Sequence, residues 1–370
     1  MVTEGEKTRD SNIELYRIIL MLLIIAHHYV VNSGLINVMY QNPLSCKAMF
    51  LFIFSAWGKI GINCFILITG YFMCKSKITI KKLLKLLFEV EFYNIVIYGT
   101  FCFTGVTSFD LKNFIKAILP FTSIAQNFTG CFLLFYLFIP YVNKLIESLN
   151  KKEFEKLIVL MFLVYSLMGN IPGFKVVINY ITLYVFIYCI GAYIRLYPIK
   201  WFFNKRIISL FTLGTILLCI CSVICCLFIG EKADKKIAFY FVTDSNKVLA
   251  VLSSISLFLF FKNLNVKYNK FINEIATSIF GVLLIHSNSD VMRKFLWNDL
   301  LNNIEIYYSN WLIPHAILSV FGVFIVCLII DQIRINTIER ILFKEDGFVD
   351  KLIYKCKNTY NRLELKMSKM

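Results

Sequence analysis

Long apolar segments separated by short polar, lysine-rich connections make up most of this chain. Ten such segments can be recognised, at about residues 13–31, 48–73, 86–106, 128–146, 157–170, 178–197, 207–230, 248–261, 275–290 and 311–333. The hydrocarbon core of a bilayer is roughly 30 Å thick, and a helix needs about 20 apolar residues to cross it. The pattern therefore predicts an all-α, polytopic integral membrane helix bundle with about ten transmembrane helices.

Three stretches depart from the pattern of full-length spans. The fifth and eighth segments are short, and they could be re-entrant or nearly untilted. Residues 109–125 carry Lys112, Lys116 and Pro120, so this stretch is predicted to be a helix that lies on the membrane surface.

Composition narrows the class of protein further. Of the 370 residues, 58% are hydrophobic, which exceeds the roughly half that is usual for a soluble domain. The long apolar runs exclude a disordered chain and a nucleic-acid binder with a solvated basic face. The twelve cysteines lie mostly inside apolar segments and form no CxxC ladder with nearby histidine, so the sequence predicts neither a metal site nor a disulfide framework. The expected surroundings are a lipid bilayer, without nucleic acid.

The distribution of basic residues predicts the orientation. Lysine and arginine are retained in short cytoplasmic loops during membrane insertion. With the N-terminus placed inside, 28 of the 39 Lys and Arg residues fall on the cytoplasmic side. The sequence thus predicts an even number of spans, both termini cytoplasmic, a transmembrane domain over residues 1–335 and a cytoplasmic basic tail over residues 336–370.

The first apolar segment carries the candidate chemistry. Arg17 and His28 are eleven residues apart, which puts them on one helix face with roughly 16 Å between them along the axis. Glu14 shares that face, whereas His27 points about 100° away. An ionisable residue at membrane depth is costly and is a functional candidate. The alternative is that Arg17 reaches the interface with its long side chain while His28 makes one structural hydrogen bond.

Four elements, in order along the chain, carry a resemblance to a known family. They are the Arg17 to His28 spacing after Ile-Glu-Leu-Tyr, the strip 62–72 that ends in Thr-Gly-Tyr-Phe, the helix 130–141 with its proline, and Ser-Ile-Phe-Gly-Val-Leu-Leu-Ile-His over 278–286. Together they resemble the membrane-bound acyltransferase-3 family, whose members acylate bacterial surface sugars. Thr69 stands where the family usually has serine, and Cys131 or Phe132 where it has tryptophan.

The resemblance implies a donor, an acceptor and a location. The donor is an acyl thioester, normally acetyl-CoA, supplied from the cytoplasm, and the acceptor is a hydroxyl of a capsule, exopolysaccharide or other cell-envelope glycan, free or lipid-linked. The protein is then an O-acetyltransferase of the bacterial cytoplasmic (inner) membrane, a multi-pass enzyme that needs no metal. Transfer finishes within the membrane domain or on a separate envelope-biosynthesis partner protein.

Roles for individual residues follow from the resemblance. His28 is expected to act as a general base or as a transient acyl carrier, with Arg17 and Glu14 as the other catalytic candidates on its face. Arg17 is also expected to bind the CoA phosphates, together with Lys82 and Lys85, whose spacing resembles the family's Arg-x-x-Arg element. Lys82 and Lys85 are equally well explained as a positive-inside anchor.

The late histidine, His286, is a further candidate. Asp290 follows His286 at i+4, which predicts that both lie on one helix face, where the pair could orient an imidazole or contact an acceptor sugar near the outer side. The alternative is a polar helix end that emerges into water.

Two other classes of protein remain open from the sequence. A secondary transporter or a flippase for lipid-linked sugars would also have many spans and isolated intramembrane charges, although no internal repeat or pair of interrupted helices is found. A structural membrane protein would explain the composition but not the shared face of Arg17 and His28.

Overall fold

The computed structural model describes residues 10–119, 128–171 and 179–367, and every regular element within them is helical. The predicted all-α class is confirmed for these residues. The α-helices are α1 (Ser11–Val31), α2 (Leu35–Met39), α3 (Cys46–Ser55), α4 (Gly58–Met73), α5 (Ile80–Phe103), α6 (Leu111–Ile118), α7 (Phe128–Ser148), α8 (Lys151–Met161), α9 (Tyr180–Leu196), α10 (Lys205–Ala233), α11 (Val248–Lys262), α12 (Lys270–Thr277), α13 (Ile279–His286), α14 (Asp290–Lys294), α15 (Asn303–Tyr308), α16 (Leu312–Arg334), α17 (Arg340–Leu342) and α18 (Phe348–Met367). Shorter π or 3-10 segments are η1 (Phe162–Leu167), η2 (Met168–Asn170), η3 (Lys200–Phe203), η4 (Phe295–Leu300) and η5 (Ile335–Glu339).

Six helical stretches in the described residues are long and apolar enough to cross a membrane. They are α1, α3 with α4, α5, α7, α10 and the stretch Leu312–Leu342. The pair Lys270–His286 and Asp290–Leu300, bent by 93°, is a seventh candidate, and α9 and α11 are apolar but shorter. The chain is therefore a multi-pass membrane protein, while the count of ten spans stays a prediction.

Contacts between α1 and α4 show that these two helices run in opposite directions. Gly58 lies against the His27 ring near the end of α1, and Gly61 lies against Ile24, one turn earlier in α1. We call the end of the bundle where α1 starts the inner end, because the charge pattern predicts that it is cytoplasmic, and the opposite end the outer end.

Two further helices run parallel to α4, from the outer to the inner end. Lys59 Nζ donates a hydrogen bond to the Tyr180 hydroxyl at the start of α9 (2.9 Å), and Arg195 Nη1 at its end donates to the Tyr71 hydroxyl (2.9 Å). Lys262 at the end of α11 also lies over the Tyr71 ring, 6.0 Å from its centroid. Both short apolar helices thus follow the direction predicted for the sixth and eighth segments.

The remaining segments alternate in direction in the same way. Ser11 at the start of α1 bonds to Asn273 of α12, and His315 near the start of α16 bonds to Tyr29 near the end of α1, so α12 and α13 run with α1 and α16 runs against it. Contacts at two levels along each helix show that α5 runs against α16 and α7 runs with α9. In the same way, α8 runs against α9 and α10 runs against α11. This alternation is what ten crossings require.

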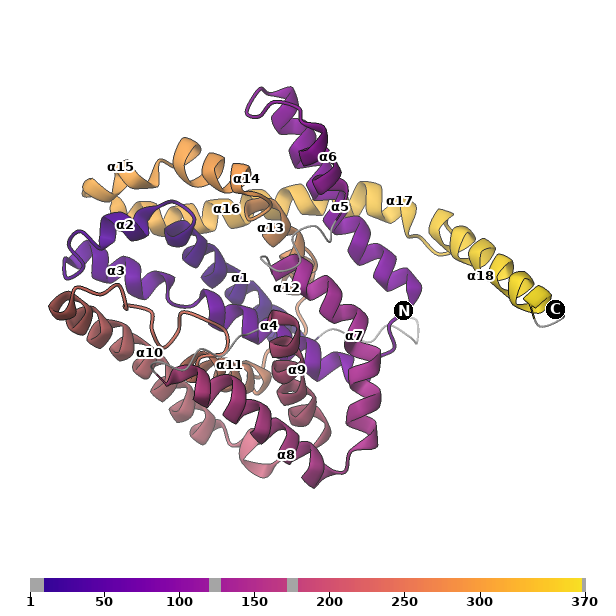
Figure 1. The fold of residues 1–370 in the computed structure, drawn as a ribbon, viewed down its shortest axis with the longest axis horizontal. Coiled ribbons are helices and arrows are strands. Elements are labelled where there is room, and N and C mark those ends of the chain that lie inside the picture. The colour runs from indigo at the N-terminus through magenta and orange to yellow at the C-terminus, as the bar shows by residue number, and fades with distance from the viewer. Residues whose placement is uncertain (1–9, 120–127, 172–178, 368–370) are drawn as a thin grey trace.

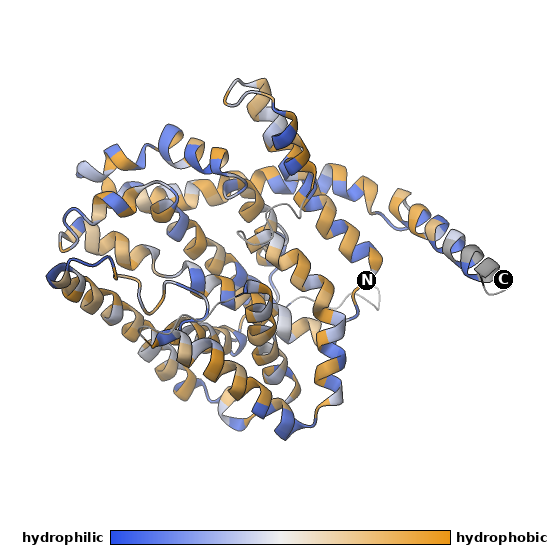
Figure 2. Ribbon diagram, in the orientation of Figure 1, coloured by the Kyte–Doolittle hydropathy of each residue, from blue (hydrophilic) through white to orange (hydrophobic). Residues whose placement is uncertain are grey.

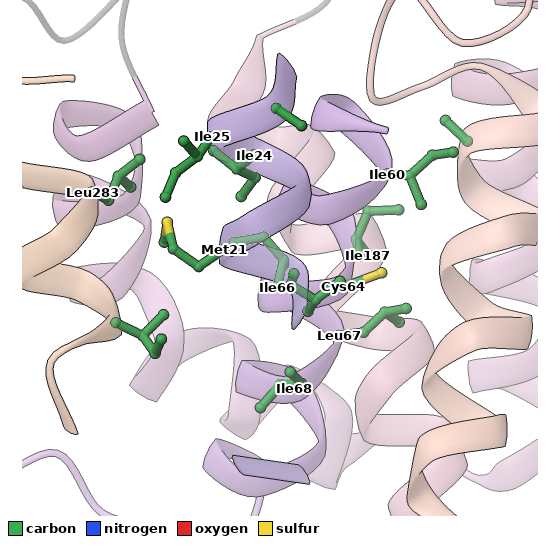
Figure 3. Packing of buried hydrophobic residues seen from close by; sticks show 14 of the residues in the cluster. Met21, Ile24, Ile25, Ile60, Cys64, Ile66, Leu67, Ile68, Ile187 and Leu283 are labelled. Carbon is green, nitrogen blue, oxygen red and sulfur yellow. The ribbon is translucent and has the colours of Figure 1, made fainter. Parts of the chain in front are cut away.

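Small residues allow the central helices to approach closely. A Cβ atom at Gly70 of α4 would lie 2.3 Å from the Tyr188 carbonyl oxygen of α9, and one at Gly191 of α9 would lie 2.3 Å from the Leu67 carbonyl oxygen of α4. Membrane helices associate largely through such backbone contacts, since lipid supplies no hydrophobic drive between them. Around this contact, Figure 3 shows buried apolar side chains of α1, α4, α9 and α13 filling the centre of the bundle.

Apolar side chains also cover the outside of several helices. Leu213 and Leu217 of α10 and Ile325 and Ile329 of α16 each expose about half of their surface, and Figure 2 shows hydrophobic positions along most of both helices. Exposed apolar surface of this extent is costly in water and suits contact with lipid chains.

Several predicted segments have different boundaries in the structure. The segment 48–73 is divided at Ala56 and Trp57 into α3 and α4, and the segment predicted at 157–170 belongs to a helix that starts at Lys151. The predicted surface helix 109–125 is present as α6, whose polar and apolar residues are strongly segregated; residues 120–125 lie outside the described part. Both α6 and α18 extend away from the bundle (Figure 1), and Lys81 of α5 holds Asp350 of α18 at 2.7 Å.

Candidate active site

Helix α1 positions Glu14, Arg17 and His28. Glu14 is buried and accepts a hydrogen bond from Arg17 Nη1 at 2.9 Å, and the Arg17 side chain is about a quarter exposed. His28 lies in the last turn of α1, which ends at Val31, so it is near the outer end of the bundle and Arg17 is near the inner end. The structure therefore brings Glu14 and Arg17 together and leaves His28 three turns away.

His28 contacts the late histidine that the sequence marked as a separate candidate. His28 Nδ1 lies 2.9 Å from His286 Nε2, although the two residues are 258 positions apart. His286 is fully buried at the end of α13, and its Nδ1 lies 2.6 Å from the Val282 carbonyl oxygen. We call these two residues the histidine pair. They belong to the first and the last of the four sequence elements that carry the family resemblance, so these two elements meet here.

The hydrogen bonds of the histidine pair determine where its protons lie. A carbonyl oxygen only accepts, so His286 Nδ1 carries the proton donated to Val282. For neutral rings, His286 Nε2 is then an acceptor, and His28 Nδ1 must be the donor. The remaining nitrogen, His28 Nε2, keeps its lone pair. This is the arrangement of a base whose ring is oriented by a hydrogen-bonded neighbour.

His27 lies in a different environment from His28. Its Nδ1 donates to the Ser55 carbonyl oxygen of α3 at 2.6 Å, and its ring fills the space that a side chain at Gly58 would need. As the helix period predicts, His27 faces another part of the bundle and has a structural contact there.

The predicted shared face of His286 and Asp290 is wrong. Helix α13 ends at His286, the chain bends by 93°, and Asp290 starts α14. The Asp290 side chain is 95% exposed and pairs with Arg293 in the same short helix. The i+4 relation applies only inside a continuous helix, and the polar run Ser287–Asn288–Ser289 ends that helix.

Three cations from three helices lie at the inner end of the bundle. Arg17 comes from α1, Arg195 from α9 and Lys262 from α11. Arg195 bonds to Tyr71, the tyrosine of the Thr-Gly-Tyr motif, and Lys262 lies 4.4 Å from the centroid of the Phe203 ring. The sequence placed Arg195 and Lys262 only among the basic residues of the cytoplasmic side, because nothing local marks them as neighbours.

Lys82 and Lys85 lie on α5 at the inner end, and their environments differ. Lys85 Nζ pairs with Glu339 at 2.6 Å, so its charge is compensated. Lys82 is exposed. No contact among the described residues joins either lysine to Arg17, and their predicted role toward CoA stays a prediction.

A buried ion cluster between α5, α16 and η5 was missed by the sequence reasoning. The Arg334 guanidinium, 2% exposed, donates to Asp331 at 2.8 Å, Glu339 at 2.6 Å and Glu89 at 3.1 Å. Tyr93 also donates to Asp331 at 2.7 Å. Glu89 of α5 is therefore paired with Arg334 of α16.

The glycine of the late sequence element explains how this cluster meets α13. A Cβ atom at Gly281 would lie 2.1 Å from Asp331 Oδ1, so only glycine lets the carboxylate sit against α13. The element Ser-Ile-Phe-Gly-Val-Leu-Leu-Ile-His therefore contacts the ion cluster with its glycine and His28 with its histidine.

The class that these features define is a polytopic membrane protein with a histidine pair inside the helix bundle and cations at its inner end. A family model gives the identity: Acyl_transf_3, an acyltransferase domain, matches residues 10–332. The chain belongs to this family of membrane acyltransferases, which confirms the resemblance. No curated protein matches the chain. No solved structure matches it either.

Proposed function

We propose that the protein is an O-acetyltransferase of the bacterial cytoplasmic membrane. It moves an acetyl group from cytoplasmic acetyl-CoA to a hydroxyl of a surface or lipid-linked glycan. The observation that carries this proposal is the histidine pair, because it leaves His28 Nε2 with a lone pair near the outer end of the bundle. A base at this position suits a donor that arrives from inside and an acceptor that approaches from outside.

In the proposed reaction, His28 alone carries the proton from the acceptor hydroxyl to the leaving thiolate. His28 Nε2 takes the proton of the acceptor hydroxyl while the hydroxyl oxygen attacks the thioester carbonyl carbon. The ester C–O bond forms, the C–S bond breaks, and the departing thiolate takes the same proton from His28 to leave as free CoA. His286 accepts the hydrogen bond from His28 Nδ1 throughout, which orients the ring and stabilises the positive charge that it carries between the two proton transfers.

The inner-end cations are proposed to hold the donor. Arg17, Arg195 and Lys262 come from three different helices and lie at the end opposite to His28, on the predicted cytoplasmic side. The phosphates of CoA are at the far end of the molecule from the thioester, so a donor held there presents its acetyl group deeper in the bundle. Lys82 and Lys85, which also lie at the inner end, are proposed to form the edge of the same basic surface.

The proposed function is tested by the reaction itself. Purified protein in lipid nanodiscs is given [14C]acetyl-CoA and a base-treated envelope glycan fraction from cells that lack the protein. We expect free CoA thiol and labelled glycan to form together and to depend on the protein. Uptake or flipping of a lipid-linked sugar without release of CoA would instead favour the secondary transporter or flippase.

Replacing Arg17 should weaken binding of the donor more than it changes the chemistry. Arg17→Ala is expected to raise the Kd for acetyl-CoA about tenfold, since charge-assisted hydrogen bonds contribute roughly 1.5–3 kcal/mol. Arg17→Lys should restore binding only in part, because an ammonium lacks the two-pronged fit to phosphate. Calorimetry on the protein in nanodiscs measures both values. Unchanged affinity in Arg17→Ala would remove Arg17 from the donor site.

A further inference from the structure

The outer end of the bundle contains a polar pocket of about 350 Å³ that no step above uses. It lies between the end of α1 and the segment formed by α14 and η4. Six polar or charged residues contribute to its lining, Asn32, Ser33, Asp290, Arg293, Lys294 and Asn298. Its volume is at the lower end of the range for small-molecule sites, which suits one sugar unit.

The pocket is close to His28. Asn32 is the C-cap residue of α1, and its backbone N–H donates to the His28 carbonyl oxygen at 3.0 Å. Residues four apart in a helix lie on the same face, with about 6 Å of rise between them. The pocket therefore starts one turn beyond the proposed base, on the outer side.

Two lining residues have buried polar atoms without a partner. Among the described residues, Asn32 Nδ2 and Asn298 Oδ1 have no hydrogen-bond partner, although both atoms are buried. Leaving a buried donor or acceptor unpaired destabilises the protein, because the group loses its hydrogen bonds to water and gains none. One of these atoms donates and the other accepts, and a hydroxyl group can do both. The hydroxyl groups of a sugar are therefore a chemistry that fits both atoms.

The segment that carries Asn298 is firmly attached to α1. Trp297, its neighbour in η4, is fully buried and packs edge-on against Tyr29 at a ring separation of 5.9 Å. Tyr29 follows His28 directly in the sequence, so the packing holds Asn298 in register with the histidine pair. The segment η4 is a π-helix, a form that occurs often at functional sites.

We propose that this pocket is the acceptor subsite, a proposal that rests on the function proposed above. One sugar unit of the glycan occupies it, with a ring hydroxyl accepting a hydrogen bond from Asn32 and donating one to Asn298. The neighbouring hydroxyl then points down α1 toward His28 Nε2. Arg293, held by Asp290, forms the rim of the pocket.

The test measures binding of the donor and labelling of the acceptor separately. Purified protein in nanodiscs receives [14C]acetyl-CoA, and the base-treated glycan fraction serves as the acceptor probe over a range of concentrations. The Kd for acetyl-CoA, measured by calorimetry in the absence of glycan, reports on the donor side alone. Asn32→Ala and Asn298→Ala should raise the glycan concentration for half-maximal labelling about five- to tenfold, the loss expected for one hydrogen bond.

Matched variants keep the result interpretable. Asn298→Asp keeps the accepting oxygen and should stay within about threefold of wild type, and Gln41→Ala removes an exposed amide from another outer loop and should change nothing. In all four variants the affinity for acetyl-CoA should stay within twofold of wild type.

The possible failures can be told apart. An unchanged half-maximal glycan concentration in both alanine variants overturns the subsite and leaves the proposed function standing. An equal loss of acetyl-CoA affinity and of labelling also overturns it, because the residues would then act on the fold or the donor. If wild-type protein neither releases thiol nor labels glycan, the proposed function fails and the subsite fails with it.

Discussion

His28→Ala protein should lose acetyl transfer to the glycan by a factor of about one hundred to ten thousand, the usual contribution of general-base catalysis. The reason is that His28 Nε2 holds the lone pair that the histidine pair leaves available. Membrane insertion and binding of acetyl-CoA should be preserved. The measurement is the initial rate of [14C]acetyl incorporation into the glycan fraction, with the affinity for acetyl-CoA determined on the same preparation.

His27 provides the matched control for this experiment. It is adjacent to His28 and chemically identical, but it bonds to the Ser55 carbonyl oxygen and packs against Gly58. His27→Ala should therefore reduce the amount of folded protein more than the rate per folded molecule. Full transfer by His28→Ala, or loss of transfer in His27→Ala alone, would contradict the proposed base.

The role of His28 as a transient acyl carrier remains distinguishable from that of a base. Rapid acid quench of the wild-type protein with [14C]acetyl-CoA, without glycan, should leave no label on the chain if His28 is a base. Label that disappears with hydroxylamine treatment and is absent in His28→Ala would show an acetyl-histidine intermediate instead.

Arg334→Leu should cause the largest loss of stability, about 3–5 kcal/mol in the free energy of unfolding. Removing one partner from a buried ion pair leaves uncompensated charge behind, and here Arg334 contacts three carboxylates, those of Glu89, Asp331 and Glu339. Lys85 stays as a contact only for Glu339. Denaturant unfolding in micelles and the steady-state amount in membranes measure the effect.

Arg340 offers a control for the same charge change. It lies six residues further along and is exposed, so Arg340→Leu should change the free energy of unfolding by less than about 0.5 kcal/mol. Adding Glu89→Gln to Arg334→Leu should recover part of the loss, because one uncompensated carboxylate is removed. Equal unfolding of Arg334→Leu and wild type would show that the cluster does not stabilise the fold.

The sequence by itself determined the class of the protein and one face of its first helix. Apolar runs and basic connections are properties of the chain that membrane insertion reads locally, so the helical membrane fold could be predicted from them. The helix period, also local, separated His28 from His27 and placed Arg17 and Glu14 on its face. The family resemblance followed from short elements whose spacing is visible in one dimension.

Only the tertiary structure decided which helices meet. His286 contacts His28 because α13 and α1 lie side by side. Helix α4 packs against α9 where Gly70 contacts Tyr188, and no local pattern in the sequence identifies Tyr188 as the partner of Gly70. The wrong i+4 pair of His286 and Asp290 has a different cause, since the polar run Ser287–Asn288–Ser289 that ends α13 is visible in the sequence. In the sequence, Arg334 is one more basic residue at the end of a span. It can be recognised as a buried charge only in the folded chain, because the carboxylates that compensate it come from other turns and from another helix.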